Sequence, residues 1–306
     1  FKKLLCQGMV LSESFYKKND DGSKNWISPS EISINRDDKG KITGASEIKT
    51  GDHVEIGGMT KMSKSKNNGV DPQVTIDKYG ADTVRVFTMF TAPPEQTLEW
   101  NDDGVAGSQK FLRKLWSYFH DNEVLIKKGK LIFEENSLTI SKNLNTEQKK
   151  FRQSIHSNLK QANNDYKRNQ FNTVVAACMK ILNDLPNGKY PEIMHEGISI
   201  LIKLLYPIAP HICQKLWGKL CEDNNNDIQS TCWPITDENA LSLEDIELII
   251  QVDGKLRAKI TVQTDSNQEY VKKNALLHEN VAKFANKNNL RKVIFVPNKL
   301  INFVTK

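Results

Sequence analysis

The sequence predicts a multidomain α+β protein, in which a small β-rich module, an antiparallel α-helical bundle and a small C-terminal α+β domain follow one another. Three changes of pattern along the 306 residues carry this prediction. Strand-like segments divided by turn signals occupy residues 8–59, helical periodicity occupies residues 103–221, and strand-like segments return after residue 247. A chain of this length is long enough for about two to three domains with sizeable cores.

The β-rich module is predicted from its turns and its alternating residues. Asp21-Gly22 and Asp38-Lys39-Gly40 are hairpin-turn sequences. Ile32, Ile34 and Ile42 alternate with polar neighbours on either side of the second turn, and a strand-like segment follows at residues 54–56. We therefore expect short antiparallel strands over residues 8–59.

Residues 60–70 are predicted to form an exposed loop, because they are polar and contain an Asn-Gly turn sequence. Asp71 and Pro72 then supply an N-cap and a proline at the first helical position, and Gly80 is a natural helix stop. A second helix is expected from about Asp82 to just before Pro93.

The central region is predicted to be a bundle of four or five amphipathic helices. Asn- and Lys-rich stretches at 141–150 and 222–229 are predicted loops, and the aromatic residues Trp116 and Phe119 are predicted core. The apolar stripes comprise Phe111, Leu112, Leu115, Trp116 and Phe119; Phe151, Ile155, Leu159, Ala162 and Tyr166; Val174, Val175, Cys178, Ile181, Leu182 and Leu185; Ile200, Leu201, Leu204, Leu205 and Ile208; and Ile212, Leu216 and Leu220.

The C-terminal region is predicted to hold strands at 248–252, 255–262, 293–296 and 300–304, with a helix over 266–287. From residue 254 to 306, eleven Lys and Arg residues stand against three acidic residues, which gives a net charge of +8. Because side chains alternate along a strand, Lys255, Arg257 and Lys259 are expected on one face. A cationic strand face suits contact with phosphates.

Composition argues against a disordered protein and against a membrane-spanning one. With 43 Lys and Arg against 37 Asp and Glu, the net charge is +6, and 38% of residues are hydrophobic. Mean hydropathy is −0.53, and the sequence contains no apolar run approaching the ~18–20 residues of a membrane span. The N-terminus has neither a signal peptide nor an initiator Met, so we expect a cytoplasmic protein whose given sequence begins in mid-protein.

Cysteine and histidine patterns predict neither disulfides nor a metal site. Five cysteines form no Cys-x-x-Cys pair, and the six histidines lack the spacing of metal ligands. We assign the six histidine side chains to packing or to the surface. The mildly basic charge permits a nucleic-acid partner.

The segment Lys61-Met62-Ser63-Lys64-Ser65 lies between a predicted strand and a capped helix. It resembles the KMSKS signature of class I aminoacyl-tRNA synthetases. Further segments are similar to bacterial leucyl-tRNA synthetases and occur in that family's order, namely Leu4-Leu5-Cys6-Gln7-Gly8-Met9-Val10, Asn25-Trp26-Ile27-Ser28-Pro29, Gly58-Met59-Thr60 through Asp71-Pro72-Gln73, Tyr79-Gly80-Ala81-Asp82-Thr83-Val84-Arg85, Thr97-Leu98-Glu99-Trp100, Tyr206-Pro207-Ile208-Ala209-Pro210-His211, and Val252-Asp253-Gly254-Lys255-Leu256-Arg257-Ala258-Lys259-Ile260-Thr261-Val262.

The resemblance implies three domains. Residues 1–102 would end a Rossmann-type catalytic domain, with a leucine-specific insert at about 7–57, residues 103–240 would form the anticodon-binding bundle, and residues 241–306 would bind tRNA. The chain contains no His-x-Gly-His, the other half of the class I ATP site. We therefore expect that this chain corresponds to about the C-terminal third of the enzyme and that it does not activate leucine on its own.

The resemblance also implies leucine–tRNA ligase activity, with ATP, leucine and tRNA-Leu as substrates, Mg²⁺ accompanying the nucleotide, and a monomeric protein that has no membrane partner. The ATP site would comprise Lys61, Met62, Ser63, Lys64 and Ser65. Lys64 would be the main catalytic residue and Lys61 would support it, because cations stabilise charge that builds on the phosphates. Lys66 is expected on the solvated side.

The predicted tRNA-binding residues are Lys255, Arg257, Lys259, Arg291 and Lys292. Four cations of the bundle could touch phosphates, but a solvated helix face is the favoured interpretation for Arg113, Lys114, Lys167 and Arg168.

Two alternatives stay open. The chain could belong to a valine, isoleucine or methionine enzyme of the same class, although residues 8–57 and the C-terminal unit fit those less well. It could also be a free-standing tRNA-binding protein without catalysis. An in-frame His-x-Gly-His upstream of Phe1 would favour the enzyme, whereas a nearby start codon would favour the binding protein.

Overall fold

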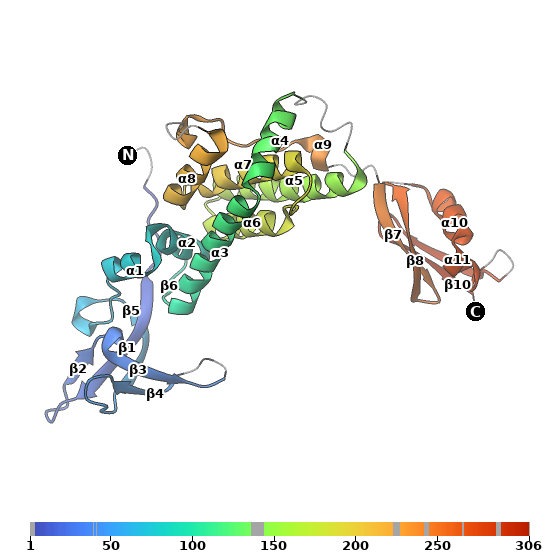
Figure 1. The fold of residues 1–306 in the computed structure, drawn as a ribbon. Helices are drawn as coiled ribbons and strands as arrows, with labels where there is room; N and C mark the ends of the chain where they lie inside the picture. Colours follow the sequence, from blue (N-terminus) through green and yellow to red (C-terminus); the bar gives the residue numbers. More distant parts are fainter. Residues whose placement is uncertain are drawn as a thin grey trace. The chain divides into compact units, whose positions relative to one another are not determined.

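The computed structural model describes residues 4–38, 40, 42–135, 144–222, 227–241, 245–264, 266–285 and 289–305. The chain divides into two compact units, residues 1–135 with 157–236, and residues 136–156 with 237–306 (Figure 1). The first unit holds both the β-rich module and most of the helical region. The three-domain division with boundaries at 102 and 240 stays a prediction.

The β-rich module is built on a sheet in the order β2-β1-β5, comprising β1 (Val10–Lys18), β2 (Lys24–Ile27) and β5 (Glu55–Lys61). Strand β6 (Leu98–Glu99) pairs in parallel with β1. Strands β3 (Ile32–Arg36) and β4 (Ile42–Glu47) form a separate hairpin, and the short 3-10 helix η1 (Pro29–Glu31) precedes it. The hairpin predictions at Gly22 and Gly40 are confirmed, with φ of 81° and 80°.

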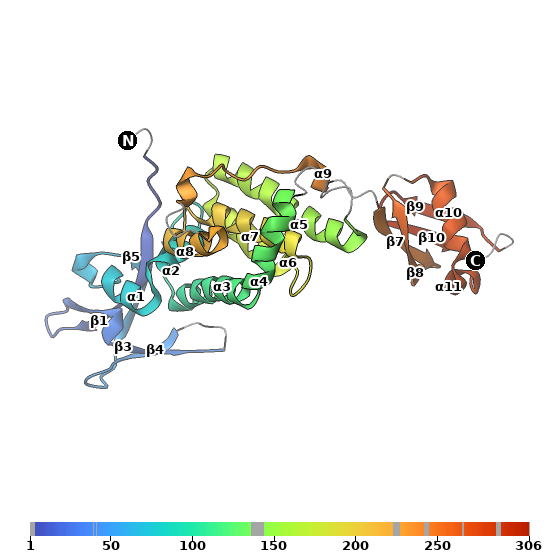
Figure 2. The ribbon, with the colours of Figure 1, turned by 45° about the horizontal axis from the view of Figure 1, so that its top comes forward.

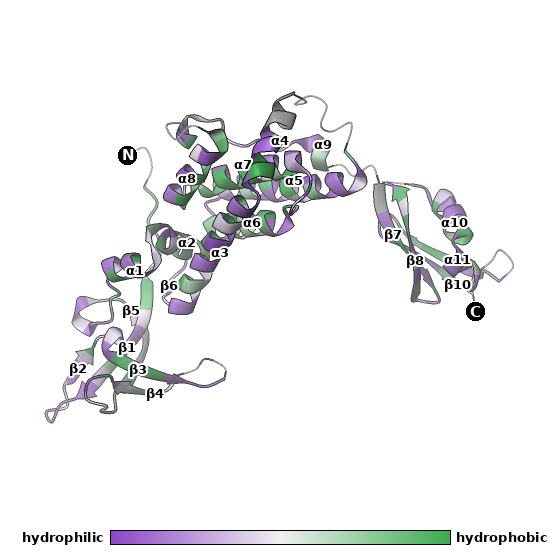
Figure 3. Ribbon diagram, in the orientation of Figure 1, coloured by the Kyte–Doolittle hydropathy of each residue, from purple (hydrophilic) through white to green (hydrophobic). Residues whose placement is uncertain are grey.

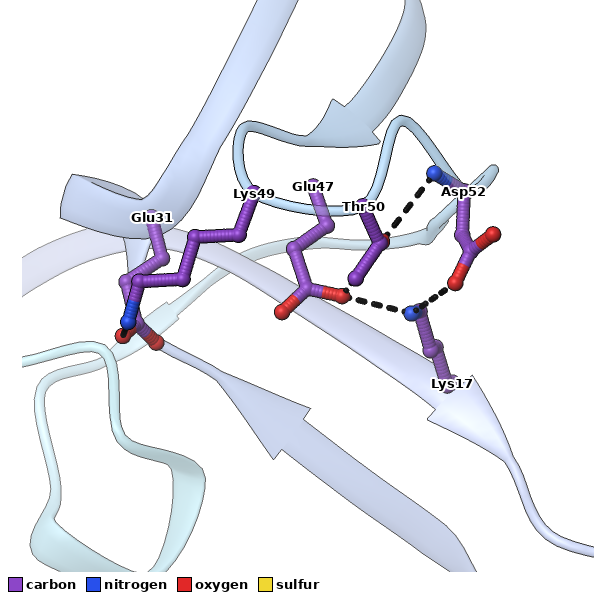
Figure 4. A network of polar contacts seen from close by, with 6 residues as sticks. All are labelled: Lys17, Glu31, Glu47, Lys49, Thr50 and Asp52. Carbon is purple, nitrogen blue, oxygen red and sulfur yellow. Dashed lines mark hydrogen bonds and ion pairs between the residues drawn. The ribbon is translucent and has the colours of Figure 1, made fainter.

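Apolar packing and one polar network hold the β3–β4 hairpin to the rest of the module. Phe15, Ile27, Ile32, Ala45 and Val54 form its buried core. In Figure 4, the Lys17 ammonium of β1 donates to Glu47 at 2.6 Å and to Asp52 at 2.9 Å. Thr50 Oγ1 also donates to Glu47, at 3.0 Å. One lysine thus ties β1 to both ends of the turn after β4.

Two short helices follow the signature segment as predicted. Helix α1 (Pro72–Tyr79) begins with Asp71 accepting a hydrogen bond from Gln73 N, and Pro72 is its first residue. Helix α2 (Ala81–Thr91) starts directly after Gly80, whose φ of 87° ends α1. Glycine adopts such a conformation without steric cost.

In its described residues, the helical region between 102 and 221 holds six α-helices, α3 (Asp102–Asp121), α4 (Glu123–Glu135), α5 (Thr146–Lys167), α6 (Phe171–Asp184), α7 (Pro191–Leu205) and α8 (Pro210–Cys221). The prediction of four or five helices is therefore wrong, because α4 breaks from α3 at Asn122. The predicted loop at 141–150 is wrong from residue 146 onward, where α5 begins; residues 141–143 lie outside the described residues. In the other predicted loop, 222–229, the 3-10 helix η4 (Ile228–Ser230) begins, and residues 223–226 are outside the described part.

Helix α7 is the centre of the bundle. It carries mostly hydrophobic residues (Figure 3), and α4 and α6 both pack along it (Figure 2). The predicted stripes are buried at Leu115, Ile155, Ile181 and Leu201. The prediction that Trp116 is core is wrong: its side chain is 38% exposed and lies against His120, whereas Phe119 is fully buried as predicted.

The second unit contains a four-stranded sheet in the order β8-β7-β10-β9, formed by β7 (Asp245–Val252), β8 (Lys255–Gln263), β9 (Lys292–Val296) and β10 (Leu300–Val304). Strands β7 and β10 are parallel and the other neighbours antiparallel. The unit also includes α9 (Glu238–Leu241). The four predicted strands are confirmed.

The described part of the helix predicted over 266–287 holds two helices, α10 (Gln268–Leu277) and α11 (Glu279–Ala282), and residues 286 and 287 lie outside the described residues. The break falls at His278, whose side chain accepts a hydrogen bond from Asn280 N and so caps α11. Val271, Ala275 and Val281 of these helices pack with the sheet residues Leu248, Ile250, Val252, Val262, Ile301 and Phe303 in one core.

Candidate functional site

The signature segment starts as a strand and leaves the sheet after one residue. Lys61 is the last residue of β5 and pairs with Leu11 of β1. Met62 N still donates to Val10 O at 3.0 Å, and the chain then turns away. The prediction of a loop over 60–70 is therefore wrong at its start, because Thr60 and Lys61 are sheet residues.

Residues 64–66 form the 3-10 helix η2 (Lys64–Lys66), and Ser63 caps it. The Ser63 hydroxyl accepts from Lys66 N at 3.2 Å and lies 3.2 Å from the Ser65 hydroxyl. The two serine hydroxyls thus help to hold the turn together. Lys64 on this turn and Lys61 at the end of β5 are both exposed. Cationic side chains on a hydrogen-bonded turn can reach the phosphates of a bound nucleotide.

Asn68 lies three residues after the signature segment, and its side chain is 0% exposed. The prediction that residues 60–70 are exposed is therefore wrong at Asn68. Its Oδ1 accepts from Ser63 N at 2.9 Å. Its Nδ2 lies within 3.2–3.4 Å of Thr60 Oγ1 and of the carbonyl oxygens of Ser12, Thr60 and Lys61. Sequence reasoning missed this residue, since its polar neighbours carry no sign of burial.

Lys66 lies against the β-rich module. Its ammonium is 5.5 Å from the centroid of the Trp26 ring of β2, and its side chain is half-buried. The expectation that Lys66 points to solvent is therefore wrong. Ammonium groups within about 6 Å of an indole ring are attracted to it. Strand β2 and the 3-10 helix η2 thus lie against each other.

Helix α2, which follows the signature segment, is fixed to the bundle. The Asp82 carboxylate accepts from Ile212 N at 2.7 Å and lies 2.8 Å from His211 Nδ1. Arg85 donates through Nε to Ile208 O at 2.8 Å and through a terminal nitrogen to Pro207 O at 3.0 Å. Asp82 and Arg85, about one turn apart on α2, thus both form hydrogen bonds with the segment that joins α7 to α8.

In the second unit, a β-bulge changes the predicted cationic face of β8. Ile250 of β7 opposes Ala258, but the next residue, Gln251, opposes Leu256, so Arg257 bulges out of register. Opposed residues share a face. Leu256, 58% exposed, therefore lies on the same face as Lys259, and the prediction that Lys255, Arg257 and Lys259 share one face is wrong.

The bulged Arg257 stacks its guanidinium on Phe284, with 3.7 Å between its central carbon and the ring centroid. Its Nε is buried and has no hydrogen-bond partner among the described residues. Lys259 pairs with Glu247 at 3.0 Å. Lys255 at the start of β8 is exposed, as are Arg291 and Lys292 at the start of β9.

Lys255, Arg291 and Lys292 lie at one end of the sheet. Lys255 opposes Val252, Val252 opposes Phe303, and Phe303 opposes Val293, the residue after Lys292. This row crosses all four strands. The structure thus brings three of the five predicted tRNA-binding residues to the same end of the sheet, at its two outer strands, and places Arg257 and Lys259 in contacts within the unit.

The remaining cation predictions concern the bundle. Arg113, Lys114, Lys167 and Arg168 are all exposed, which agrees with a solvated helix face. Within the described residues, no group of three or more His, Cys, Asp or Glu side chains could hold a metal ion. None of the helices described is long and apolar enough to cross a membrane.

Two family models match this chain. The model described as tRNA synthetases class I (I, L, M and V) matches residues 54–101, which hold β5, the signature segment, α1 and α2. The model described as the anticodon-binding domain of tRNA ligase matches residues 148–273. Over these two ranges, the chain is therefore similar to class I tRNA synthetases.

Relatives that match nearly the whole chain include leucine–tRNA ligases. That of Paraburkholderia xenovorans is 45% identical over 306 residues, which is 99% of this chain and 35% of the relative. That of Vibrio cholerae is 44% identical over 310 residues, with the same coverage. The structure of an Agrobacterium radiobacter K84 LeuRS in a ternary complex with tRNA and LeuAMS matches with a TM-score of 0.59 and 26% identity, over 80% of this chain and 30% of that one.

This chain is a leucyl-tRNA synthetase homologue over nearly its whole length, and it spans about a third of the length of the curated relatives it matches. The resemblance predicted from the signature and its flanks is confirmed.

Proposed function

We propose that this chain works as part of a leucine–tRNA ligase, which activates leucine with ATP and transfers it to tRNA-Leu. The observation that carries the proposal is the conformation of residues 61–66, which we call the signature turn. It exposes Lys64 on a hydrogen-bonded 3-10 helix and Lys61 at the end of β5, within a chain 45% identical to a leucine–tRNA ligase.

The turn would act on the nucleotide. Activation is attack of the leucine carboxylate on the α-phosphate of ATP, and pyrophosphate leaves. Negative charge grows on the phosphates in the transition state, so ammonium groups held beside them lower the barrier. We assign the main contact to Lys64 and a supporting contact to Lys61, whereas Met62, Ser63 and Ser65 shape the ATP site. Mg²⁺ would enter with ATP as the metal–nucleotide substrate.

The remaining regions would bind tRNA-Leu. The exposed cations Lys255, Arg291 and Lys292 lie at one end of the C-terminal sheet and suit contact with phosphates. Arg257 and Lys259 belong to the same proposed surface, and each would have to leave its present partner to reach the RNA. The helical bundle would support the tRNA stem. We further propose a cytoplasmic, monomeric enzyme whose catalysis also requires a His-x-Gly-His segment outside this chain.

To test this proposal, the full-length gene product is purified. It is then assayed for leucine-dependent exchange of pyrophosphate into ATP and for charging of tRNA-Leu. Isoleucine, valine and methionine serve as competing substrates. Activity with leucine alone is expected. Exchange with another of these amino acids would favour a different class I enzyme. Binding of tRNA without any exchange would favour a free-standing tRNA-binding protein.

A further inference from the structure

We propose that Asn68 is a positioning residue for the signature turn, fixing the backbone from which Lys61 and Lys64 project. The inference rests on the proposed function, because it assigns Asn68 a role in the activation of leucine. Asn68 itself lies outside the five-residue signature and is fully buried, so it acts through the backbone and not by touching the nucleotide.

The Asn68 amide suits its surroundings on both sides. A side-chain amide offers one acceptor oxygen and two N–H donors. The oxygen accepts from Ser63 N at 2.9 Å, and the two N–H groups face four acceptors of Ser12, Thr60 and Lys61 at 3.2–3.4 Å. Aspartate could keep only the contact to Ser63, since it has no N–H groups. An aliphatic residue could keep neither.

These contacts return the chain to the point at which it left the sheet. Ser12 belongs to β1, Thr60 and Lys61 end β5, and Ser63 caps η2. The side chain of Asn68 therefore closes residues 61–67 into a ring whose base is fixed and whose exposed tip carries Lys64 and Ser65. These hydrogen bonds hold the backbone on both sides of the tip, and this restricts the positions that Lys64 can reach.

A fixed backbone matters because the rate of activation depends on the position of the Lys64 ammonium relative to the phosphates. Displacing a catalytic group by about 1 Å can cost about a hundredfold in rate. Removing the Asn68 hydrogen bonds frees the backbone at Ser63, directly before Lys64, and lets the ammonium occupy many positions. The expected loss lies in the transition state, so kcat for activation should fall by about tenfold or more while KM for ATP changes little.

The variants separate the two halves of the amide. Asn68→Ala removes all of its hydrogen bonds, and Asn68→Asp keeps the acceptor but replaces the donors. Asn67→Asp is the matched control, since it makes the same chemical change one residue away at an exposed position. It also keeps a residue type that tolerates the left-handed conformation of Asn67, where φ is 48°.

The experiment uses the full-length protein and three measurements. Leucine-dependent pyrophosphate exchange gives kcat and KM for ATP, trypsin cleavage after Lys61, Lys64 and Lys66 reports the order of the turn, and thermal unfolding reports the global fold. Both Asn68 variants should lose kcat and be cleaved faster at the turn, with a melting temperature close to that of the wild type. Asn67→Asp should match the wild type in all three.

Wild-type kcat in both Asn68 variants would overturn the proposal. So would a loss of kcat accompanied by global unfolding in both variants, because that result assigns Asn68 a structural role only. If the wild-type protein shows no leucine-dependent exchange, the proposed function fails instead, and the role of Asn68 in catalysis falls with it. Faster trypsin cleavage in the variants would then report only that Asn68 orders the turn.

Discussion

The carboxylate of Asp82 accepts a hydrogen bond from Ile212 N at 2.7 Å, so a side chain of α2 caps the first turn of α8, 130 residues further along the chain. The same carboxylate lies 3.4 Å from His211 N and 2.8 Å from His211 Nδ1. The first N–H groups of a helix have no partner within it and favour negative charge. Asp82 thus joins the region that follows the signature turn to the helical bundle.

Replacing Asp82 should therefore weaken the bundle. The Asp82 side chain is only 11% exposed, and Asp82→Ala leaves the first N–H groups of α8 without this acceptor. We expect a loss of about 1–2 kcal/mol in the free energy of unfolding, the usual cost of removing a helix cap. Denaturant unfolding of the full-length protein measures it. Asp20→Ala, at an exposed turn, is the control, and an equal effect in both variants would contradict a capping role.

Lys64 should govern the rate of leucine activation. Lys64→Ala removes one charge that would stabilise the transition state, and loss of such a group typically lowers kcat by about 10²–10³. KM for ATP should change far less. Pyrophosphate exchange by the full-length protein separates the two quantities. Lys49→Ala removes an exposed lysine of the β-rich module and should leave both unchanged. Equal losses in kcat and in ATP binding for Lys64→Ala would contradict the assignment.

Gly129 should not tolerate a side chain. A Cβ atom built on Gly129 of α4 would lie 1.9 Å from the carbonyl oxygen of Pro191 at the start of α7. The steric cost of about 1–3 kcal/mol should exceed the helix propensity gained, at most about 1 kcal/mol. Gly129→Ala is expected to lower the melting temperature of the full-length protein.

Gly107 provides the opposite case on α3. A Cβ there meets nothing within 4 Å, so Gly107→Ala should leave the melting temperature unchanged or raise it. The close approach of α4 and α7 would be contradicted if the two alanine variants behaved alike.

The Lys17 network should make the stability of the β-rich module depend on pH. Hydrogen bonds from Lys17 lower the pKa of Glu47 and of Asp52, and the same bonds raise the pKa of Lys17. The carboxylates therefore contribute stability above their ordinary pKa values of 4.5 and 3.8, and that contribution is lost as pH falls through their lower folded values. The contribution of Lys17 is lost only as pH rises above 10.5.

Thermal unfolding of the full-length protein and its Lys17→Met variant tests this dependence. The difference in melting temperature should be constant from about pH 6 to pH 9 and should shrink below about pH 4. The control is Lys18→Met, which changes the neighbouring exposed lysine. A difference that grows on acidification would contradict the assigned direction.

The cationic end of the C-terminal sheet should bind tRNA through phosphates. Removing the charges of Lys255 and Lys292 with glutamine should weaken tRNA binding by the full-length protein. For each phosphate that is no longer neutralised, the slope of log affinity against log salt concentration should become shallower by roughly one. Lys273→Gln, on the exposed side of α10, should change neither quantity. An unchanged salt slope in the Lys255 and Lys292 variants would contradict the proposed surface.

Local patterns in the sequence determined most of the secondary structure. The caps at Asp71 and Gly80, the hairpin turns at Gly22 and Gly40 and the four C-terminal strands depend on neighbouring residues, so the sequence alone was sufficient to predict them. The signature motif likewise identified the region of the site, because the chemistry requires particular residues in a short segment.

The tertiary structure decided what distant residues do to one another. Asn68 is buried because β1 and β5 surround it, and no property of its polar neighbours shows that. The bulge at Arg257 depends on the register between β7 and β8, and a shift of one residue moves Leu256 to the face predicted for the cations. Asp82 meets Ile212 only when the bundle has formed. Hydrogen-bond partners far apart in sequence leave no periodic trace in it, so the fold alone assigns them.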